Sequence, residues 1–254
     1  MVIVWPLKVY SSALQMLKNL ILIVLFFSVL FTKAQETTVK KNILNEESVV
    51  RGEDGMVYPY AAWRKLMASG RYGLKNRETF TEKGKPEYLI YQLSADEKVK
   101  YFSKMPKPGV SESFPEGELF NGLKVTDMNG NKYDLRDSTG KVIVLNFWFI
   151  NCPPCKTEIP QLNELAALYK DKNVVFLAVA LDEKPALKSF LKGTPFDYNI
   201  VDGGRYIANK YDVKGYPTHV VVDKSGYIKF STLGLASNTV YWVKKSIDEA
   251  LLGK

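Results

Sequence analysis

Residues 141–155 read Lys141-Val-Ile-Val-Leu-Asn-Phe-Trp-Phe-Ile-Asn-Cys-Pro-Pro-Cys155. The part up to Phe149 is apolar on both alternating faces, which predicts a central strand that is covered on each side. Residues 153–170 follow as a predicted helix, because apolar side chains recur along one side of it. The two cysteines therefore lie where a buried strand passes into a helix.

Cys152 and Cys155 are the only cysteines of the 254-residue chain. Cys152 directly precedes the predicted helix, where unpaired backbone N–H groups carry partial positive charge and favour a thiolate over a thiol. We therefore expect Cys152 to have a lowered pKa and to be the attacking sulfur. Cys155 follows one helical turn later, where it can form a disulfide with Cys152 and resolve a mixed disulfide. Pro153 and Pro154 suit the first helical turn, because a missing N–H costs little there.

The pattern after residue 114 predicts an α/β fold with a mixed central sheet. A hairpin signal at residues 123–135 precedes the strand at 141–149, and the later pattern alternates strands with helices before it ends in a second hairpin and a helix. The expected later strands cover residues 174–180, 198–201, 219–222 and 227–230. Asp182 and Pro185 are expected to start a helix that Gly193 stops, and Asn238 is expected to cap the last helix. This order is typical of a single α/β domain over residues 114–254.

Residues 35–113 are interpreted as a linker and a small accessory region. Residues 35–55 are polar and charged, as in a linker or a frayed arm. Beyond them we expect a short amphipathic helix at 60–68, a strand at 87–93, and a helix opened by the capping box Ser94-Ala-Asp-Glu97. No chemistry is assigned to this region.

The N-terminus predicts an export signal over residues 1–34. Leu20 to Phe31 is an almost continuous apolar stretch that follows Lys18 and precedes Ala34, a small residue before a polar segment. This stretch is short of the about 20 apolar residues that span a membrane, which favours a cleaved signal peptide over an uncleaved anchor. A translation start at Met16 would place Lys18 directly before the apolar centre. We expect cleavage after Ala34 and an exported, periplasmic protein.

The composition is that of a globular protein, with 46% hydrophobic residues and a formal net charge of +8. Three of the lysines lie in residues 1–34, and the remaining basic residues are scattered among acidic ones. This pattern indicates a solvated, mildly basic surface and gives no support to a nucleic-acid groove.

Two motifs resemble a known family. The segment Asn146-Phe-Trp-Phe-Ile-Asn-Cys-Pro-Pro-Cys-Lys-Thr-Glu-Ile-Pro160 resembles the active-site segment of thioredoxin-like proteins, most closely the TlpA/ResA group of exported thiol-disulfide oxidoreductases. Gly215-Tyr-Pro-Thr218 resembles their second signature. The resemblance spans roughly residues 114–252 and implies a thioredoxin-like fold. It also implies that Pro217 is cis and packs beside the cysteines, and that the backbone of Tyr216 offers hydrogen bonds to an extended substrate segment.

The same resemblance implies roles for single residues near the cysteines. Glu158 matches a glutamate that manages protons for the second cysteine, although an exposed glutamate in the first helical turn is the alternative. Asn146 stands where cytosolic thioredoxins have a buried aspartate, and Pro160 matches a proline that bends the helix. Asn151 departs from the pattern, because many relatives carry tryptophan there. The expected substrate-contacting residues are Pro217, Tyr216, Trp148, Pro153 and Pro154, with Trp148 as core or pocket wall.

These features predict an oxidoreductase that reduces disulfides of exported proteins by dithiol exchange, without a bound cofactor. Electrons would come from another thiol protein, such as a membrane carrier, and relatives of this kind serve cytochrome c maturation. An oxidant that donates its disulfide is the enzymatic alternative. Oxidants of the DsbA type carry a large helical insertion, whereas one modest helix joins residues 174–180 to 198–201 here, which favours the reductase.

A metal-binding module is the alternative from another class. His219 is the only histidine of the chain and could join Cys152 and Cys155 around copper or zinc. Zinc sites usually have four ligands, whereas copper(I) accepts fewer and prefers thiolates. A lone histidine in a strand is more often structural. Peroxidase chemistry is disfavoured, because no upstream motif combines a cysteine with threonine and arginine.

Overall fold

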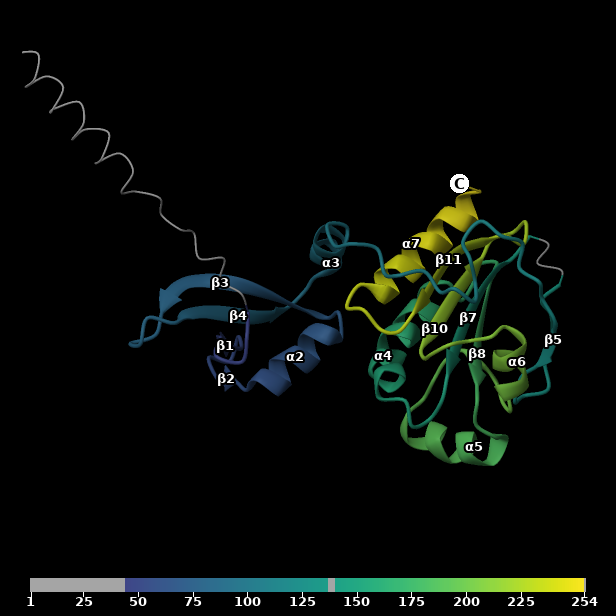
Figure 1. Cartoon of the computed structure of the whole chain (residues 1–254), viewed down its shortest axis with the longest axis horizontal. Helices are drawn as coiled ribbons and strands as arrows, with labels where there is room; N and C mark the ends of the chain where they lie inside the picture. Colours follow the sequence, from purple (N-terminus) through teal and green to yellow (C-terminus); the bar gives the residue numbers. More distant parts are fainter. Residues whose placement is uncertain (1–43, 137–139, 254) are drawn as a thin grey trace, which may run out of the picture. The chain divides into compact units, whose positions relative to one another are not determined.

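The computed structural model describes residues 44–136 and 140–253 (Figure 1). The described residues from Asn45 onward belong to one compact unit. The predicted signal peptide over residues 1–34, with its cleavage site and the suggested start at Met16, lies outside the described residues. Within the described part of the chain, every helix is too short or too polar to cross a membrane.

The first described elements form a four-stranded sheet in the order β2-β1-β4-β3 (Figure 1). Its strands are β1 (Val49–Arg51), β2 (Val57–Tyr58), β3 (Tyr72–Phe80) and β4 (Pro86–Gln92), and the helices of this region are α2 (Tyr60–Ala68) and α3 (Ala95–Phe102). Helix α2 packs on the sheet through Trp63, which shares a buried cluster with Val50 and Tyr88. This sheet therefore has a small core of its own.

Three predictions for this region are confirmed, and one is wrong. The helix at 60–68, a strand within 87–93 and the capping box are present: the side chain of Ser94 accepts from the Glu97 N–H, and Glu97 accepts in return from the Ser94 N–H. The linker interpretation is wrong for Val49–Arg51, which pairs with β2 and β4 as strand β1. Val50 is fully buried. Burial of one valine thus outweighs the polar composition around it.

The main sheet has five strands in the order β11-β10-β7-β8-β9. Its strands are β7 (Val142–Trp148), β8 (Val174–Ala180), β9 (Asn199–Val201), β10 (Thr218–Val222) and β11 (Ile228–Leu233). Strands β7, β8 and β9 run parallel, whereas β10 is antiparallel to both β7 and β11. The predicted mixed sheet is confirmed. The hairpin of β5 (Lys124–Thr126) and β6 (Lys132–Asp134) is also confirmed.

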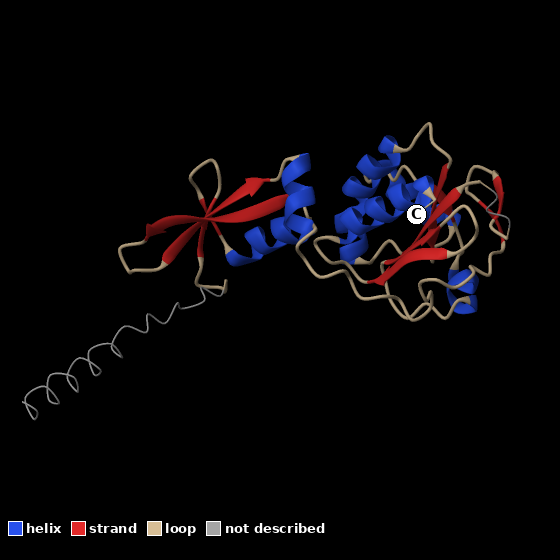
Figure 2. Ribbon diagram, turned by 90° about the horizontal axis from the view of Figure 1, so that it is seen from above, coloured by secondary structure: helices blue, strands red, loops and turns tan. Residues whose placement is uncertain are grey.

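Helices cover both sides of this sheet, as Figure 2 shows. They are α4 (Pro153–Leu168), α5 (Lys184–Gly193), α6 (Arg205–Lys210) and α7 (Thr239–Leu252). Alternate residues of β7 enter two different cores. Val144 and Trp148 join the cluster formed with α4 and α7, whereas Leu145 and Phe147 join the cluster that contains Phe114 and α6 residues. Because both faces are covered, β7 is buried along its whole length, as its apolar sequence predicts.

The first residue of α5 and the capping of α7 differ from the prediction. Helix α5 begins at Lys184 after Glu183, so Asp182 stands before the helix and is free to bind elsewhere. Asn238 precedes α7 as predicted, but its side chain makes no cap hydrogen bond. It donates instead to the carbonyl oxygen of Pro106, 2.9 Å away. Asn238 thus connects the start of α7 to the chain that leads out of α3.

Leu162 tests the core beneath α4. Its side chain is fully buried, whereas Leu168 on the same helix is 57% exposed. Replacing a buried leucine by alanine loses transfer free energy and leaves a cavity, so we expect Leu162→Ala to lower the free energy of unfolding by about 2–5 kcal/mol. Leu168→Ala is the matched control and should change it by at most about 0.5 kcal/mol. Urea unfolding of both variants gives the comparison, and equal losses would contradict the described packing.

Candidate functional site

Cys152 and Cys155 form a disulfide, with their sulfurs 2.03 Å apart and their Cα atoms 5.3 Å apart. Cys152 is the N-cap of α4, and its sulfur accepts a hydrogen bond from the Cys155 backbone N–H at 3.3 Å. Pro153 and Pro154 occupy the first two helical positions, as predicted. The helix start therefore presents a backbone donor to the Cys152 sulfur, which is the arrangement that favours negative charge there.

Both cysteines lie just beneath the surface. Cys152 is 2% exposed and Cys155 is 1% exposed, although the neighbouring Asn151 and Pro153 are exposed. Half-buried side chains also pack against the cluster that contains the cysteines, among them Tyr216 and Phe149, whose rings meet edge to face at 5.4 Å. Both sulfurs are therefore largely shielded from solvent in this conformation.

The loop before β10 contains the predicted cis proline. The Tyr216–Pro217 peptide bond is cis, which confirms the expectation drawn from the Gly-Tyr-Pro-Thr motif. Pro217 is buried, and its carbonyl oxygen accepts a hydrogen bond from the Gly234 N–H at 2.7 Å. The side chain of Thr218 donates to the carbonyl oxygen of Gly215 at 2.8 Å. These contacts hold the loop in one shape at the start of β10.

Three buried polar side chains meet between the sheet and α4. Asn146 on β7 stands directly opposite His219 on β10 in the strand register. Glu158 comes from α4: its Oε1 accepts from the Asn146 amide at 3.1 Å, and its Oε2 lies 3.0 Å from His219 Nε2. All three residues are at most 1% exposed. The alternative that Glu158 is an exposed surface charge is therefore wrong, and Asn146 is a buried amide as expected.

Tyr198 lies next to this trio. Its hydroxyl has no hydrogen-bond partner within residues 44–136 and 140–253. Burial first, and then the negative charge of Glu158, raise the pKa of Tyr198 well above its ordinary value. The hydroxyl therefore stays protonated. A carboxylate buried beside it, as Glu158 is, depends on its two hydrogen-bond partners.

Asp182 is a residue of the site that the sequence analysis assigned to a helix start. Its Oδ2 accepts a hydrogen bond from the Ile150 backbone N–H at 2.8 Å, two residues before Cys152. Asp182 lies in the loop after β8, and β8 is the parallel neighbour of β7. Loops that follow adjacent parallel strands meet at one edge of a sheet, which is the signal that could have identified this contact.

The expected substrate contact of Trp148 is not supported by its position. Its side chain is fully buried and packs against Phe190 and Phe196, with ring centroids 5.7 and 5.5 Å away. Trp148 is therefore a core residue in this conformation. Pro160 lies inside α4, where it cannot donate a backbone hydrogen bond.

The structure also bears on the metal-binding alternative. In the described part of the chain, no three or more His, Cys, Asp or Glu side chains gather in a way that could hold a metal ion. His219 faces Glu158 through Nε2, and both cysteine sulfurs are joined to each other. The ligand set of Cys152, Cys155 and His219 is therefore not brought together around one point.

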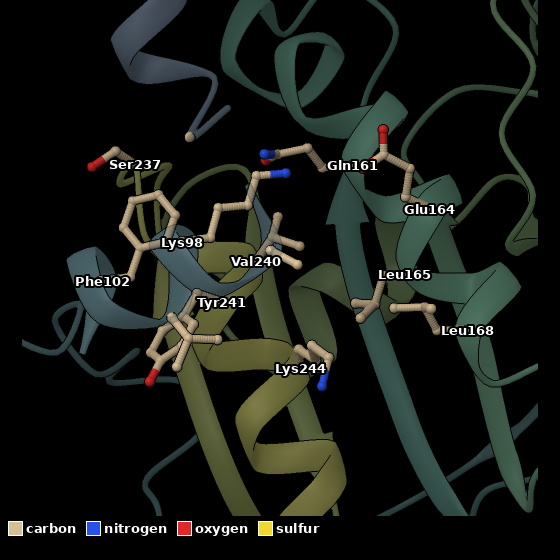
Figure 3. A pocket seen from close by; sticks show the side chains of 13 residues that line it. Lys98, Phe102, Gln161, Glu164, Leu165, Leu168, Ser237, Val240, Tyr241 and Lys244 are labelled. Carbon is tan, nitrogen blue, oxygen red and sulfur yellow. The ribbon is translucent and has the colours of Figure 1, made fainter. Parts of the chain in front are cut away.

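Three hollows border α4, and one of them adjoins its last turn through Ala166 and Ala167. A cleft of about 760 Å³ adjoins its first turn and is lined by Pro153, Lys156 and Thr157 together with residues of the N-terminal region, namely Tyr58, Ala62, Lys65, Leu66, Ser69, Arg71 and Tyr72. The pocket in Figure 3, of about 280 Å³, adjoins the second half of α4 through Leu165 and Leu168. Of these three, the cleft at the first turn is the one that reaches a residue of the cysteine motif.

Comparisons with known proteins agree with this geometry. The family model described as Redoxin matches residues 107–251. The chain is 37% identical over 130 residues to the thiol-disulfide oxidoreductase ResA of Bacillus cereus, which covers 50% of this chain and 72% of that protein. It is 37% identical over 144 residues to ResA of Geobacillus kaustophilus, which covers 56% and 75%. A crystal structure of a putative DsbE from Chlorobium tepidum is similar with a TM-score of 0.50 and 28% identity, covering 54% of this chain and 99% of that one.

Asp182→Ala tests whether this carboxylate holds the cysteine loop. Removing a charged acceptor leaves the Ile150 N–H without its partner, so we expect a loss of about 1–3 kcal/mol in the free energy of unfolding. We also expect dithiothreitol to reduce the disulfide faster, because the loop that covers it is loosened. The matched control is Asp171→Ala, at an exposed position outside the site. Equal behaviour of the two variants would mean that Asp182 does not restrain the loop.

Proposed function

The chain belongs to the Redoxin family and is a ResA-like thiol-disulfide oxidoreductase of the thioredoxin superfamily, and we propose that it reduces disulfides in exported proteins. The observation that carries the proposal is the cysteine pair at the N-terminus of α4, where the Cys155 N–H donates to the Cys152 sulfur. A backbone donor at that sulfur stabilises the thiolate that must attack a client disulfide.

The proposed cycle has two exchange steps and balances two electrons. In the reduced enzyme, the Cys152 thiolate attacks one sulfur of the client disulfide, and the other client sulfur leaves as a thiolate. Cys155 then loses its proton and attacks the Cys152 sulfur, which releases the second client sulfur as a thiolate. The client has gained two electrons and the enzyme has the Cys152–Cys155 disulfide. A thiol protein upstream must return two electrons, and the cycle needs no bound cofactor.

Glu158 is proposed to accept the proton that Cys155 loses. The two residues are three positions apart on α4, so their side chains neighbour each other on one face of the helix. Both side chains are 1% exposed, so they share the same buried environment. Tyr216 and Pro217 are proposed to hold the client segment beside the cysteines through the backbone of the loop before β10.

The cleft beside Pro153 is proposed to receive the client segment. It adjoins the residue that follows Cys152, and its volume of about 760 Å³ suits a short stretch of chain. Lys65, Arg71 and Lys156 line it together with two tyrosines, and no acidic residue does. Arg71 is paired with Glu164, which leaves the two exposed lysines to set the charge. An acidic, extended client segment matches this lining.

The direction of exchange and the compartment are part of the proposal. Between β8 and β9 the chain has the single short helix α5, without the large helical insertion of DsbA-type oxidants. This supports a reductase. The apolar stretch at residues 20–31, with its basic flank, supports export to the periplasm, where a membrane thiol carrier would be the electron donor.

Cysteine variants test the cycle. We expect Cys155→Ser to accumulate mixed disulfides with client proteins, because Cys152 attacks and nothing resolves the product. Cys152→Ser should accumulate none, and neither variant should turn over. Mass spectrometry of adducts in the native periplasm is the measurement, and the reduction potential of the wild type should lie far below the about −120 mV of the oxidant DsbA. A potential near that value would overturn the reductase direction.

Charge reversal tests the cleft. We expect Lys65→Glu with Lys156→Glu to slow reduction of a disulfide peptide flanked by aspartates by about tenfold, and to speed reduction of one flanked by lysines. Lys172→Glu, an exposed lysine that does not line the cleft, is the control and should leave both rates unchanged. Stopped-flow rates at low and high salt give the comparison. Equal loss with both peptides would place the client segment elsewhere.

A further inference from the structure

Resting on the proposed function, we propose that His219 is a positioning residue that holds Glu158 ionised and ready to take the proton of Cys155. His219 has no role in the exchange cycle described above. It is nevertheless the only histidine of the chain, it is completely buried, and its ring faces the carboxylate rather than an apolar surface.

Nε2 of His219 lies 3.0 Å from Glu158 Oε2. An ionised carboxylate can only accept, so in the proposed arrangement Nε2 carries the hydrogen. Asn146 Nδ2 lies 3.1 Å from Oε1 and 3.4 Å from each ring nitrogen of His219. The amide thus donates to the other carboxylate oxygen. The pair of strands β7 and β10 supplies one donor to each oxygen of Glu158.

Both donors are needed because Glu158 is 1% exposed and bulk solvent does not reach its carboxylate. An ionised carboxylate buried without partners is strongly disfavoured and takes up a proton instead. A protonated Glu158 could not accept a second proton from Cys155. His219 therefore keeps available the form of Glu158 that the resolving step consumes.

Other titratable groups around the pair do not supply this role. Tyr198 faces Glu158 from the segment before β9, and its raised pKa keeps it neutral. Cys155 is on α4 beside Glu158, and on β11 the residue opposite His219 is Thr232, which does not titrate. Among the described residues, His219 is thus the titratable partner of the carboxylate.

The step itself balances. The Cys155 thiol transfers its proton to Glu158 Oε2 or Oε1, and the resulting thiolate attacks the Cys152 sulfur of the mixed disulfide. The bond between Cys152 and its partner breaks, the Cys152–Cys155 bond forms, and the partner leaves as a thiolate. Glu158 then releases the proton when the enzyme is reduced again.

The test uses Ellman's reagent, which needs no client protein. Cys152 of the reduced enzyme attacks the reagent and releases one coloured thiolate, and Cys155 releases a second when it resolves the mixed disulfide. We expect His219→Val to slow the second phase by about tenfold at pH 7 and to raise the pH at which that phase is half-maximal by about one unit. His219→Gln retains a donor and should restore most of the rate.

Two further comparisons separate positioning from folding. Val221→Ala removes buried volume from the same strand and face without touching Glu158, so its pH profile should match the wild type. Glu158→Gln combined with His219→Val should be no slower than Glu158→Gln alone, because His219 acts through Glu158. An unchanged profile in His219→Val, or additive losses in the double variant, would overturn the inference.

A measurement on the wild-type protein tests the inference even if the variants do not fold. The single histidine gives one set of ¹⁵N ring signals, which report directly which nitrogen carries the hydrogen. We expect hydrogen on Nε2, and the signals should shift in Glu158→Gln. Hydrogen on Nδ1 alone would contradict the inference. If the wild type resolves Ellman's reagent with the expected profile but reduces no protein disulfide, the proposed function fails and the role of His219 stands.

Discussion

The proposed chemistry depends on one hydrogen bond, from the Cys155 backbone N–H to the Cys152 sulfur. The start of a helix can offer that donor only if the end of the preceding strand is held in a fixed position. Strand β7 is held there because both of its faces are buried, by α4 and α7 on one side and by α6 and the segment around Phe114 on the other. The fold thus serves to fix where β7 ends and α4 begins.

The proposed chemistry also depends on the burial of the residues around the cysteines. Both cysteines and the trio of Asn146, Glu158 and His219 are at most 2% exposed. In such a place electrostatic interactions are strong, and each polar group needs a partner. The cleft beside Pro153 is lined in part by residues of the N-terminal region. Under the proposed function, that region is therefore part of the surface that binds the client.

Local sequence patterns were most reliable where burial and turn chemistry agree. The apolar run of β7, the hairpin of β5 and β6, and the capping box at Ser94 were all predicted and all found. The local sequence patterns did not predict β1, in which Val50 is the one buried residue. They also did not predict β3, most of whose residues are exposed. Each of these two strands has a single buried residue, so the alternation of apolar and polar side chains that identifies a strand is missing.

The sequence alone determined the cysteine motif and the α/β class of the fold, and its resemblance to thioredoxin-like proteins implied the cis proline. Tertiary structure decided what surrounds the cysteines. Asn146 and His219 are 73 residues apart, His219 and Glu158 are 61 apart, and Ile150 and Asp182 are 32 apart. Strand register and helix packing bring these pairs together, and no local pattern encodes either one. For that reason the partner of Glu158 could be found only in the folded protein.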